Sequence, residues 1–136
     1  MSYFVLDCSV AMAWCFEDEA NEKSQNCLQY LKKSKAVVPS IWSLEVMNVL
    51  QVSEKKKRIQ AEQSNLFIKL LSILPIEVDL SSNLNKGITT ISREYGLTTY
   101  DAAYLELAVR KKIPLASLDK LLCRMAKMAN VELMLT

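Results

Sequence analysis

The sequence predicts an α/β protein with a mostly parallel sheet, built as a single domain over residues 1–136. Short apolar runs alternate with longer segments of helical periodicity, a pattern typical of a parallel sheet with crossover helices. Hydrophobic residues make up 51% of the chain, enough for one domain with a substantial core. The chain has only 2 glycines and 3 prolines, which argues against an all-β fold with many tight turns.

Five strands and the helices between them can be placed from these patterns. The strands are expected at residues 3–6, 36–38, 76–78, 114–118 and 131–134. The first of them is a continuous apolar run, which suits a strand covered on both faces. Helices are expected at residues 10–14, 17–33, 41–54, 60–74, 83–95, 101–112 and 119–129.

Capping residues predict where several helices begin and end. Ser9 and Ser40 are placed to cap the first and third helices. The acidic run at residues 17–19 favours the start of the second helix, because negative charge suits a helix N-terminus. Gly96 stands where the residue after a helix C-terminus belongs.

The helix expected at residues 60–74 carries an apolar stripe, which predicts a core-facing side. Its members are Leu66, Phe67, Leu70, Leu71 and Leu74.

Composition excludes several classes of chemistry. The chain has no histidine, so Ser-His-Asp and Cys-His catalysis and His-ligated zinc are excluded. The 4 cysteines form no C-x-x-C pair and read as reduced thiols, which predicts a cytosolic compartment. Neither a signal peptide nor an apolar stretch of about 20 residues is recognisable, so no membrane association is expected. The net charge of +2 leaves any nucleic-acid contact to local patches.

Four acidic residues fall at one edge of the predicted sheet. Asp7 directly follows the first strand, and Asp119 directly follows the fourth. Asp101 lies in the first turn of the helix that precedes the fourth strand. Glu45 lies in the helix after the second strand, about 8 Å from its start at 1.5 Å per residue. Ligands of parallel α/β sheets bind at the carboxyl ends of the strands. The four carboxylates are therefore expected to converge there.

Each acid also has an explanation that needs no ligand. Asp7 can simply end a strand, and Asp119 is a preferred N-cap residue. Asp101 matches the third position of a capping box that begins at Thr98. Glu45 is the hardest to explain in this way, because its helical neighbours are largely apolar and no basic residue lies within a turn. Such a carboxylate is costly unless it is paired or bound to a cation.

Converging carboxylates favour a divalent metal site. Close carboxylates repel one another and some would take up protons, whereas two divalent cations would cancel their formal charge. Mg²⁺ and Mn²⁺ prefer oxygen ligands, and Mg²⁺ usually keeps several waters. A pair of ions about 4 Å apart can activate a water and stabilise the leaving oxygen of a phosphodiester. Asp7, Glu45, Asp101 and Asp119 are thus candidates for both metal ligation and catalysis.

Residues 5–14, 39–50, 95–104 and 115–119 carry four motifs that resemble, in this order, those of PIN-domain ribonucleases. The resemblance is closest to VapC-type toxins of prokaryotic toxin–antitoxin (VapBC) pairs. It implies a three-layer α/β/α sandwich with strand order 3-2-1-4-5. It also implies Mg²⁺- or Mn²⁺-dependent endoribonuclease activity, a homodimer, and inhibition by a cognate antitoxin.

The resemblance assigns positions to the four acids. Asp7, Glu45 and Asp101 match the three most regular acidic positions of the family. Asp119 matches a fourth position that is more variable.

The resemblance also implies supporting residues. Ser9 stands where a hydroxyl is often near the metal, and Asn48 where a polar residue often supports the site. Ser117 replaces a usual threonine and keeps its hydroxyl. Leu121 and Leu122 stand where some members add an acid, so the number of metal ions, one or two, stays open.

Other features have functional and structural interpretations. The basic run at residues 55–58 is either an RNA phosphate contact or a solvated helix end. The basic residues 110–112 suit a helix C-terminus. Cys8 is expected to pack beside the site. Packing is also preferred over base stacking for the aromatic residues on apolar stripes, which are Trp14, Trp42, Phe67 and Tyr104.

Three functions compete at this point. The first is a metal-dependent endoribonuclease that acts as a toxin. The second is a phosphoryl-transferring domain like the haloacid dehalogenases, which requires Asp-x-Asp after the first strand; here the second position is Ser9. The third is a non-catalytic PIN-like module that binds RNA or protein.

Overall fold

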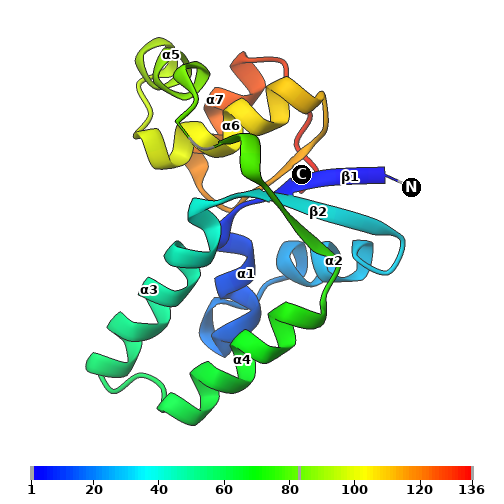
Figure 1. The fold of residues 1–136 in the computed structure, drawn as a ribbon. Helices are drawn as coiled ribbons and strands as arrows, with labels where there is room; N and C mark the ends of the chain where they lie inside the picture. The colour runs from blue at the N-terminus through cyan, green and yellow to red at the C-terminus, as the bar shows by residue number, and fades with distance from the viewer. Residues whose placement is uncertain (1, 83, 136) are drawn as a thin grey trace.

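The computed structural model describes residues 2–82 and 84–135, and it contains a parallel sheet between two groups of helices (Figure 1). The strands are β1 (Ser2–Leu6), β2 (Ser34–Pro39), β3 (Ile76–Asp79) and β4 (Leu115–Ala116). Their order is β3-β2-β1-β4, and all three pairings are parallel. The predicted α/β class is therefore confirmed.

The fifth predicted strand is reduced to a single bridge. Leu133 pairs in parallel with Leu115, on the far side of β4 from β1. The Leu115 N–H donates to Glu132 O and the Met134 N–H donates to Leu115 O, both at 2.9 Å. The sheet therefore has the order 3-2-1-4, with a bridge in place of the expected fifth strand. Because β4 has only two residues, it can support little more than one bridge.

Helices cover both faces of the sheet (Figure 1). One group consists of α1 (Cys8–Cys15), α2 (Glu22–Tyr30), α3 (Ile41–Lys55) and α4 (Ala61–Ile73). The other consists of α5 (Lys86–Tyr95), α6 (Thr99–Lys111) and α7 (Lys120–Met128). Two short 3₁₀ helices, Glu17–Glu19 and Leu80–Ser82, connect elements.

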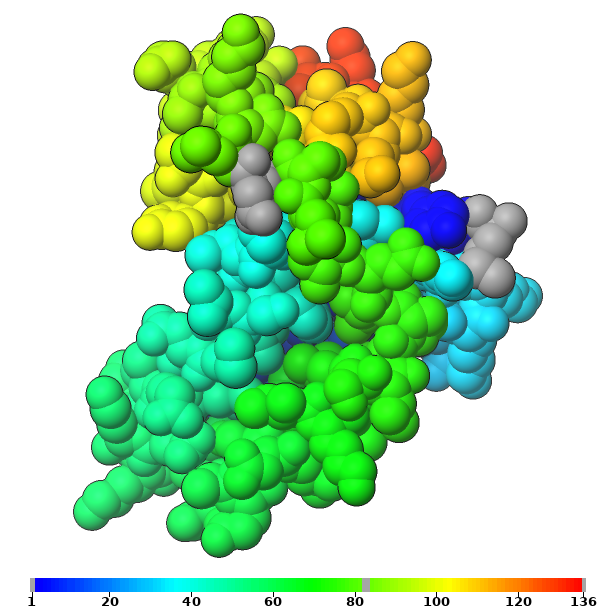
Figure 2. Space-filling view, viewed as in Figure 1, coloured from blue at the N-terminus to red at the C-terminus, as the bar shows by residue number. Residues whose placement is uncertain are grey.

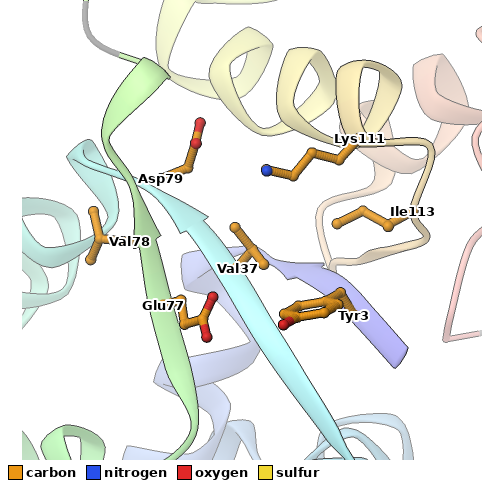
Figure 3. Close-up of a pocket in the computed structure, with 7 residues that line it drawn as sticks. All are labelled: Tyr3, Val37, Glu77, Val78, Asp79, Lys111 and Ile113. Atoms are coloured by element: carbon orange, nitrogen blue, oxygen red, sulfur yellow. The ribbon is translucent and has the colours of Figure 1, made fainter. Parts of the chain in front are cut away.

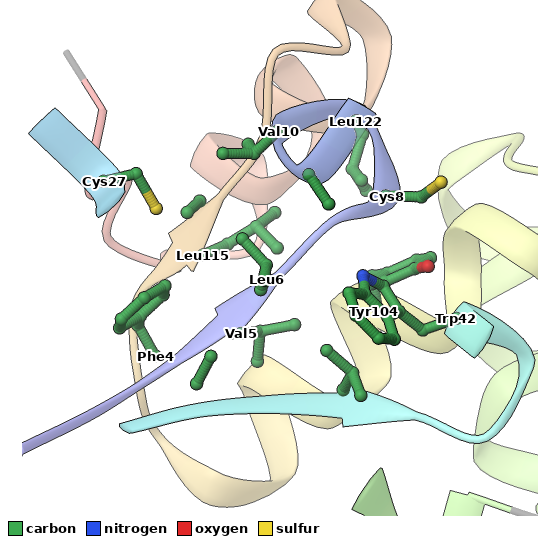
Figure 4. Packing of buried hydrophobic residues seen from close by; sticks show 14 of the residues in the cluster. Phe4, Val5, Leu6, Cys8, Val10, Cys27, Trp42, Tyr104, Leu115 and Leu122 are labelled. Atoms are coloured by element: carbon green, nitrogen blue, oxygen red, sulfur yellow. The ribbon is translucent and has the colours of Figure 1, made fainter. Parts of the chain in front are cut away.

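The core lies where β1 and α6 meet. Phe4, Val5 and Leu6 of β1 are almost completely buried, as expected for a central strand covered on both faces. On α6, every residue from 102 to 108 is buried. Figure 4 shows the Tyr104 ring beside Trp42 and close to the β1 side chains. This packing fixes α6, and with it Asp101 in the first helical turn, relative to the end of β1.

The predicted starts of the first two helices are wrong, whereas the third begins at Ile41 as predicted but lacks the expected capping bond. Asp7, not Ser9, occupies the N-cap position of α1. Ser40 occupies that position for α3, but it has helical backbone angles and makes no side-chain capping bond. The acidic run forms the separate 3₁₀ helix Glu17–Glu19, and α2 begins at a capping box between Asn21 and Ser24. This box satisfies the first N–H groups of α2 better than nearby negative charge can.

The predicted core face of α4 is only partly correct. Phe67 and Leu71 are buried, whereas Leu66 is 59% and Leu70 49% exposed. Residues 67 and 71 lie one turn apart and face the core, while residues 66 and 70 are rotated by about 100° from them. α4 therefore presents apolar side chains to the outside.

The helix predicted at residues 83–95 has its expected start outside the described residues; as described, α5 begins at Lys86. Its predicted end is confirmed, since Gly96 adopts the left-handed conformation with φ 64°. Within residues 2–82 and 84–135, no helix combines the length and apolar character needed to cross a membrane.

Candidate active site

Asp7 is the centre of the candidate site. It directly follows β1, its backbone N–H donates to Ala116 O at 3.0 Å, and only 6% of the residue is exposed. The hydroxyls of Ser9 and Ser117 both donate to Asp7 Oδ2, each at 2.7 Å. Two hydroxyls on one oxygen fix the orientation of the carboxylate.

The same two hydroxyls connect Asp7 to the loop after β4. Ser9 Oγ accepts the Leu118 N–H at 3.0 Å, and Ser117 Oγ accepts the Asp119 N–H at 3.0 Å. Each hydroxyl therefore accepts a backbone bond while donating to Asp7. This arrangement places Asp119 next to the buried carboxylate.

Asp119 and Asp101 both lie at helix starts, as expected. Asp119 is the N-cap of α7, and its Oδ1 accepts the Leu122 N–H at 2.9 Å. Thr98 is the N-cap of α6, and its Oγ1 accepts the Asp101 N–H at 3.1 Å. Capping thus accounts for the backbone position of each acid and leaves a carboxylate at each helix N-terminus.

Glu45 has a partner that the sequence did not reveal. The hydroxyl of Tyr104 donates to Glu45 Oε1, and Tyr104 itself is 0% exposed. Tyr104 follows Asp101 by three residues on α6, so the two side chains share a helix face. That spacing is the one sequence feature that could have indicated a polar role for Tyr104, which was expected only to pack.

The electrostatics show that the four acids are neighbours. Burial raises the pKa of the Asp7 carboxyl; the bonds from Ser117 and Ser9 oppose this, and Asp119 adds to it. Burial also raises the pKa of Glu45, against the bond from Tyr104, and the charges of Asp7 and Asp101 add to the rise. The pKa of Asp101 is raised by burial and then by the charges of Asp119 and Asp7, against a bond with Thr98. Burial first, and then the charges of neighbouring acids, therefore disfavour the charged forms of these three carboxyls.

This donor set fits a hard divalent cation. All four side chains offer carboxylate oxygen, the ligand that Mg²⁺ and Mn²⁺ prefer. Among the described residues, no three acids or cysteines are close enough to form a ready cluster of metal ligands. Mg²⁺ is usually held by one or two carboxylates and retains several waters, so it does not require such a cluster. A bound cation would favour the charged forms that burial and neighbouring acids disfavour here.

The other predicted residues lie outside this hydrogen-bonded group. Asn48 is exposed one turn after Glu45, and its side chain makes no hydrogen bond to the part of the chain that the structure describes. Cys8 is buried beside the acids, and burial followed by the charges of Glu45 and Asp7 raises its thiol pKa to about 12. A thiol with that pKa stays neutral at physiological pH, which agrees with the expected packing role. All four cysteines are free thiols.

Two basic segments have structural partners. Arg58 pairs with Asp18 at 2.6 Å and Glu19 at 2.9 Å, and its guanidinium stacks on Phe16. Arg110 binds Glu106 at 2.8 Å and Asp79 at 2.6 Å. Arg110 thus joins α6 to the end of β3, a role not expected from its position near a helix C-terminus.

A separate hollow of about 390 Å³ lies over the face of the sheet (Figure 3). Figure 3 shows Glu77 and Asp79 from β3 and Tyr3 from β1, with Lys111 of α6 pointing toward Asp79. None of the four clustered acids lines this hollow. The candidate site is therefore defined by its carboxylates and not by this depression.

Comparison with known proteins identifies a matching family model and solved structures with a similar fold. The family model described as PIN domain matches residues 4–128. PAE2754 from Pyrobaculum aerophilum has a similar structure, with a TM-score of 0.70 and 21% identity, covering 91% of this chain and 79% of that one. No curated protein sequence matches significantly.

Two further solved structures share the fold. VapBC2 from Rickettsia felis, bound to a DNA fragment from their promoter, has a TM-score of 0.69 and 14% identity, covering 96% of each chain. FitAcB from Neisseria gonorrhoeae has a TM-score of 0.63 and 14% identity, covering 96% of this chain and 95% of that one. At these identities the structures support the fold alone. The match to the family model, which spans most of the chain, shows that this protein belongs to the PIN-domain family.

Proposed function

We propose that this protein is a Mg²⁺- or Mn²⁺-dependent endoribonuclease that acts as the toxin of a toxin–antitoxin pair. One observation carries the proposal: four carboxylates lie at one edge of the sheet, and three of them have pKa values raised by burial and by the charge of at least one other acid of the four. Folding these acids together has a cost that a bound cation would offset. Membership in the PIN family supports nuclease chemistry.

The residues would divide the work as follows. Asp7, held by Ser9 and Ser117, provides a rigid anchor for a cation, and Asp101 and Asp119 provide further oxygens at helix starts. The cation, when bound, would activate a water and stabilise the leaving oxygen of the phosphodiester.

Glu45 has a distinct part in this scheme. Tyr104 orients it by donating to Oε1, which leaves its other carboxylate oxygen to hold a proton or a water near the scissile phosphate. This proton transfer needs no histidine, in agreement with the composition.

The competing functions are less well supported. Phosphoryl transfer through an aspartyl intermediate needs a second acid two residues after Asp7. That place is taken by Ser9, whose hydroxyl instead donates to Asp7. A purely binding module would have no need for an ordered set of uncompensated carboxylates.

Replacement of Asp101 by Asn tests the proposal. Asp101→Asn removes one charge from the edge and leaves the Thr98 capping bond to the backbone intact. We expect the variant to fold, to lose Mg²⁺-stimulated cleavage of RNA and to relieve growth inhibition. Glu94→Gln, a change of an exposed acid on α5, is the matched control. Undiminished cleavage by Asp101→Asn would refute the assignment.

The partners belong to the same proposal. We infer a homodimer and a cognate antitoxin in the cytoplasm. Support comes from exposed apolar side chains on α3 and α4, including Leu44, Leu66, Leu70 and Ile73. Figure 2 shows the face of the molecule on which these two helices lie side by side. The similar fold of VapBC2 is consistent with this inference.

A search for the antitoxin follows directly. The product of a short open reading frame upstream of the gene should co-purify with the protein and abolish its RNA cleavage. Purification of an active, uninhibited protein after co-expression of that product would exclude it as the antitoxin.

A further inference from the structure

A basic groove crosses the edge of the sheet beside β4. A hollow of about 600 Å³ is lined mainly by α2, and a hollow of about 550 Å³ mainly by α7. Lys23 and Leu135 line both hollows, so the two adjoin. The basic groove is defined here by its six cationic residues, which are Lys23, Lys32, Lys33, Lys120, Arg124 and Lys127.

The charge of the basic groove is unbalanced. Among the described residues, none of its six cations forms an ion pair, and no Asp or Glu lines either hollow. Arg58 and Arg110 differ, because both are engaged by carboxylates. With a net charge of only +2 for the whole chain, six unpaired cations in one groove are a local concentration. Such a concentration favours a polyanionic ligand.

The basic groove leads to the candidate active site. Ser117 lines the α7 hollow, and its hydroxyl donates to Asp7 Oδ2 at 2.7 Å. Lys120, at the start of α7, directly follows Asp119 in sequence. The α7 hollow therefore adjoins the loop after β4 that carries Asp119 and holds Asp7.

The remaining lining suits unpaired bases. Tyr30, at the end of α2, is 48% exposed, and the floor includes Leu133, Met134 and Leu135 of the C-terminal segment. An exposed aromatic ring can stack on a base only where that base is unpaired. Cations that follow the backbone, together with an aromatic platform, are the usual components of a single-strand site.

We propose that single-stranded RNA enters the active site along the basic groove, with its phosphates on the α2 and α7 cations. For the cleavage step this inference rests on the proposed function, but the binding step does not. The phosphates would contact Lys23, Arg124 and Lys127 in the α7 hollow, and Lys32 and Lys33 in the α2 hollow. The basic run at residues 55–58, at the far end of α3, is not part of this path (Figure 1).

Binding can be measured separately from cleavage. The probe is a fluorescein-labelled single-stranded RNA of about 12 nucleotides, within the usual range of single-strand sites. Anisotropy is recorded in EDTA, with Asp101→Asn present in every protein so that the probe stays intact. The groove variant carries Lys23→Gln, Arg124→Gln and Lys127→Gln. The matched control carries Lys55→Gln, Lys56→Gln and Lys57→Gln, the same charge change on exposed residues elsewhere.

We expect the groove variant to bind RNA on the order of 100-fold more weakly at about 0.1 M salt, because each lost phosphate contact reduces the salt slope by about 0.7. The control should keep the parental affinity and slope. A duplex of the same sequence should bind more weakly than the single strand.

Other outcomes separate the two proposals. Equal binding by the groove variant and the control would overturn the RNA path, while cleavage by the protein without Asp101→Asn would still support the enzyme. Groove-dependent binding by a protein that cleaves no RNA in Mg²⁺ would support the path and refute the nuclease. Failure of the parental protein to bind the RNA would also overturn the path, and would leave an acidic protein segment as the groove's ligand.

Discussion

At the scale of single residues, the clustered carboxyls make the site a source of instability when no cation is bound. The pKa values of Asp7, Glu45 and Asp101 are raised, so these groups bind protons more tightly in the folded chain than in the unfolded one. Their stabilising effect is complete below the ordinary carboxyl pKa, 3.8 for Asp, and is lost as the pH rises through the raised values. The metal-free protein should therefore become less stable from that pH upward.

The variant Asp101→Asn tests this linkage. In EDTA at about pH 7.5 we expect it to be more stable than the parent by about 1 kcal/mol, or roughly 4 °C in Tm. The difference should disappear below pH 3.8, where the Asp101 carboxyl of the parent is protonated in both the folded and the unfolded state. Mg²⁺ should raise the Tm of the parent more than that of the variant. Scanning calorimetry measures all three effects; a parent that is the more stable protein at neutral pH in EDTA would contradict the account.

Tyr104 acts on the site only through Glu45. Tyr104→Phe removes the hydroxyl that orients Glu45 and keeps the buried ring. We expect the variant to fold and to bind Mn²⁺ about 10- to 100-fold more weakly, a typical effect of removing a residue that supports a ligand. Tyr100→Phe, an exposed change on the same helix, serves as the control. Titration calorimetry with Mn²⁺ gives the affinities, and equal values for the two variants would exclude the positioning role.

At the scale of elements, local patterns predicted helices and strands well but not their contacts. The alternation of apolar runs and helical segments correctly predicted the four strands that the structure contains and the order of the helices. Capping predicted Asp119 and Thr98 correctly, because a cap bonds to residues two or three positions away. The Tyr104–Glu45 bond joins residues 59 positions apart, and such a contact exists only after the helices pack.

Strand length was the least predictable feature of the elements. β4 ends after Ala116, although the apolar run continues to Leu118. Its pairing stops there because β1 itself ends at Leu6, the partner of Ala116. Beyond that point the Ser117 hydroxyl bonds to Asp7 and to the Asp119 N–H.

The exposed Arg110 fastens α6 to the end of β3 through Asp79 and also pairs with the buried Glu106 of its own helix. Glu106 is 6% exposed, and besides Arg110 it accepts a bond from Asn85 at 3.1 Å. Arg110→Ala would remove the cation from the buried Glu106 carboxylate, so we expect a loss of about 2 kcal/mol in the free energy of unfolding. Arg93→Ala, a change of an exposed residue on α5, should cost less than about 0.5 kcal/mol. Urea denaturation provides both values, and similar losses would show that the pair does not stabilise this junction.

At the scale of the whole molecule, charge and apolar surface are separated. The acids occupy the carboxyl edge of the sheet, and the basic groove lies along the adjoining β4 edge. The exposed apolar side chains of α3 and α4 lie on the helices that extend away from the sheet (Figures 1 and 2). A second copy of the chain bound on α3 and α4 would therefore leave the basic groove open to substrate.

The exposed apolar stripe on α4, which consists of Leu66, Leu70 and Ile73, should determine the oligomeric state. Leu66, Leu70 and Ile73 follow helical spacing, and Ile73 is 74% exposed. If this stripe forms the dimer interface, Leu70→Glu would bury a charge without a partner. We expect dimerisation at least tenfold weaker, equal to about 1.4 kcal/mol.

Light scattering during gel filtration, over a dilution series, gives the mass of the assembly. Val109→Glu places the same charge at an exposed apolar residue of α6, outside the stripe, and should leave a dimer intact. A dimer that survives Leu70→Glu but dissociates with Val109→Glu would move the interface to α6. A parent protein that stays monomeric at every concentration would leave the α4 stripe free for the antitoxin. In that case Leu70→Glu should weaken antitoxin binding, because the same desolvated contact would be lost.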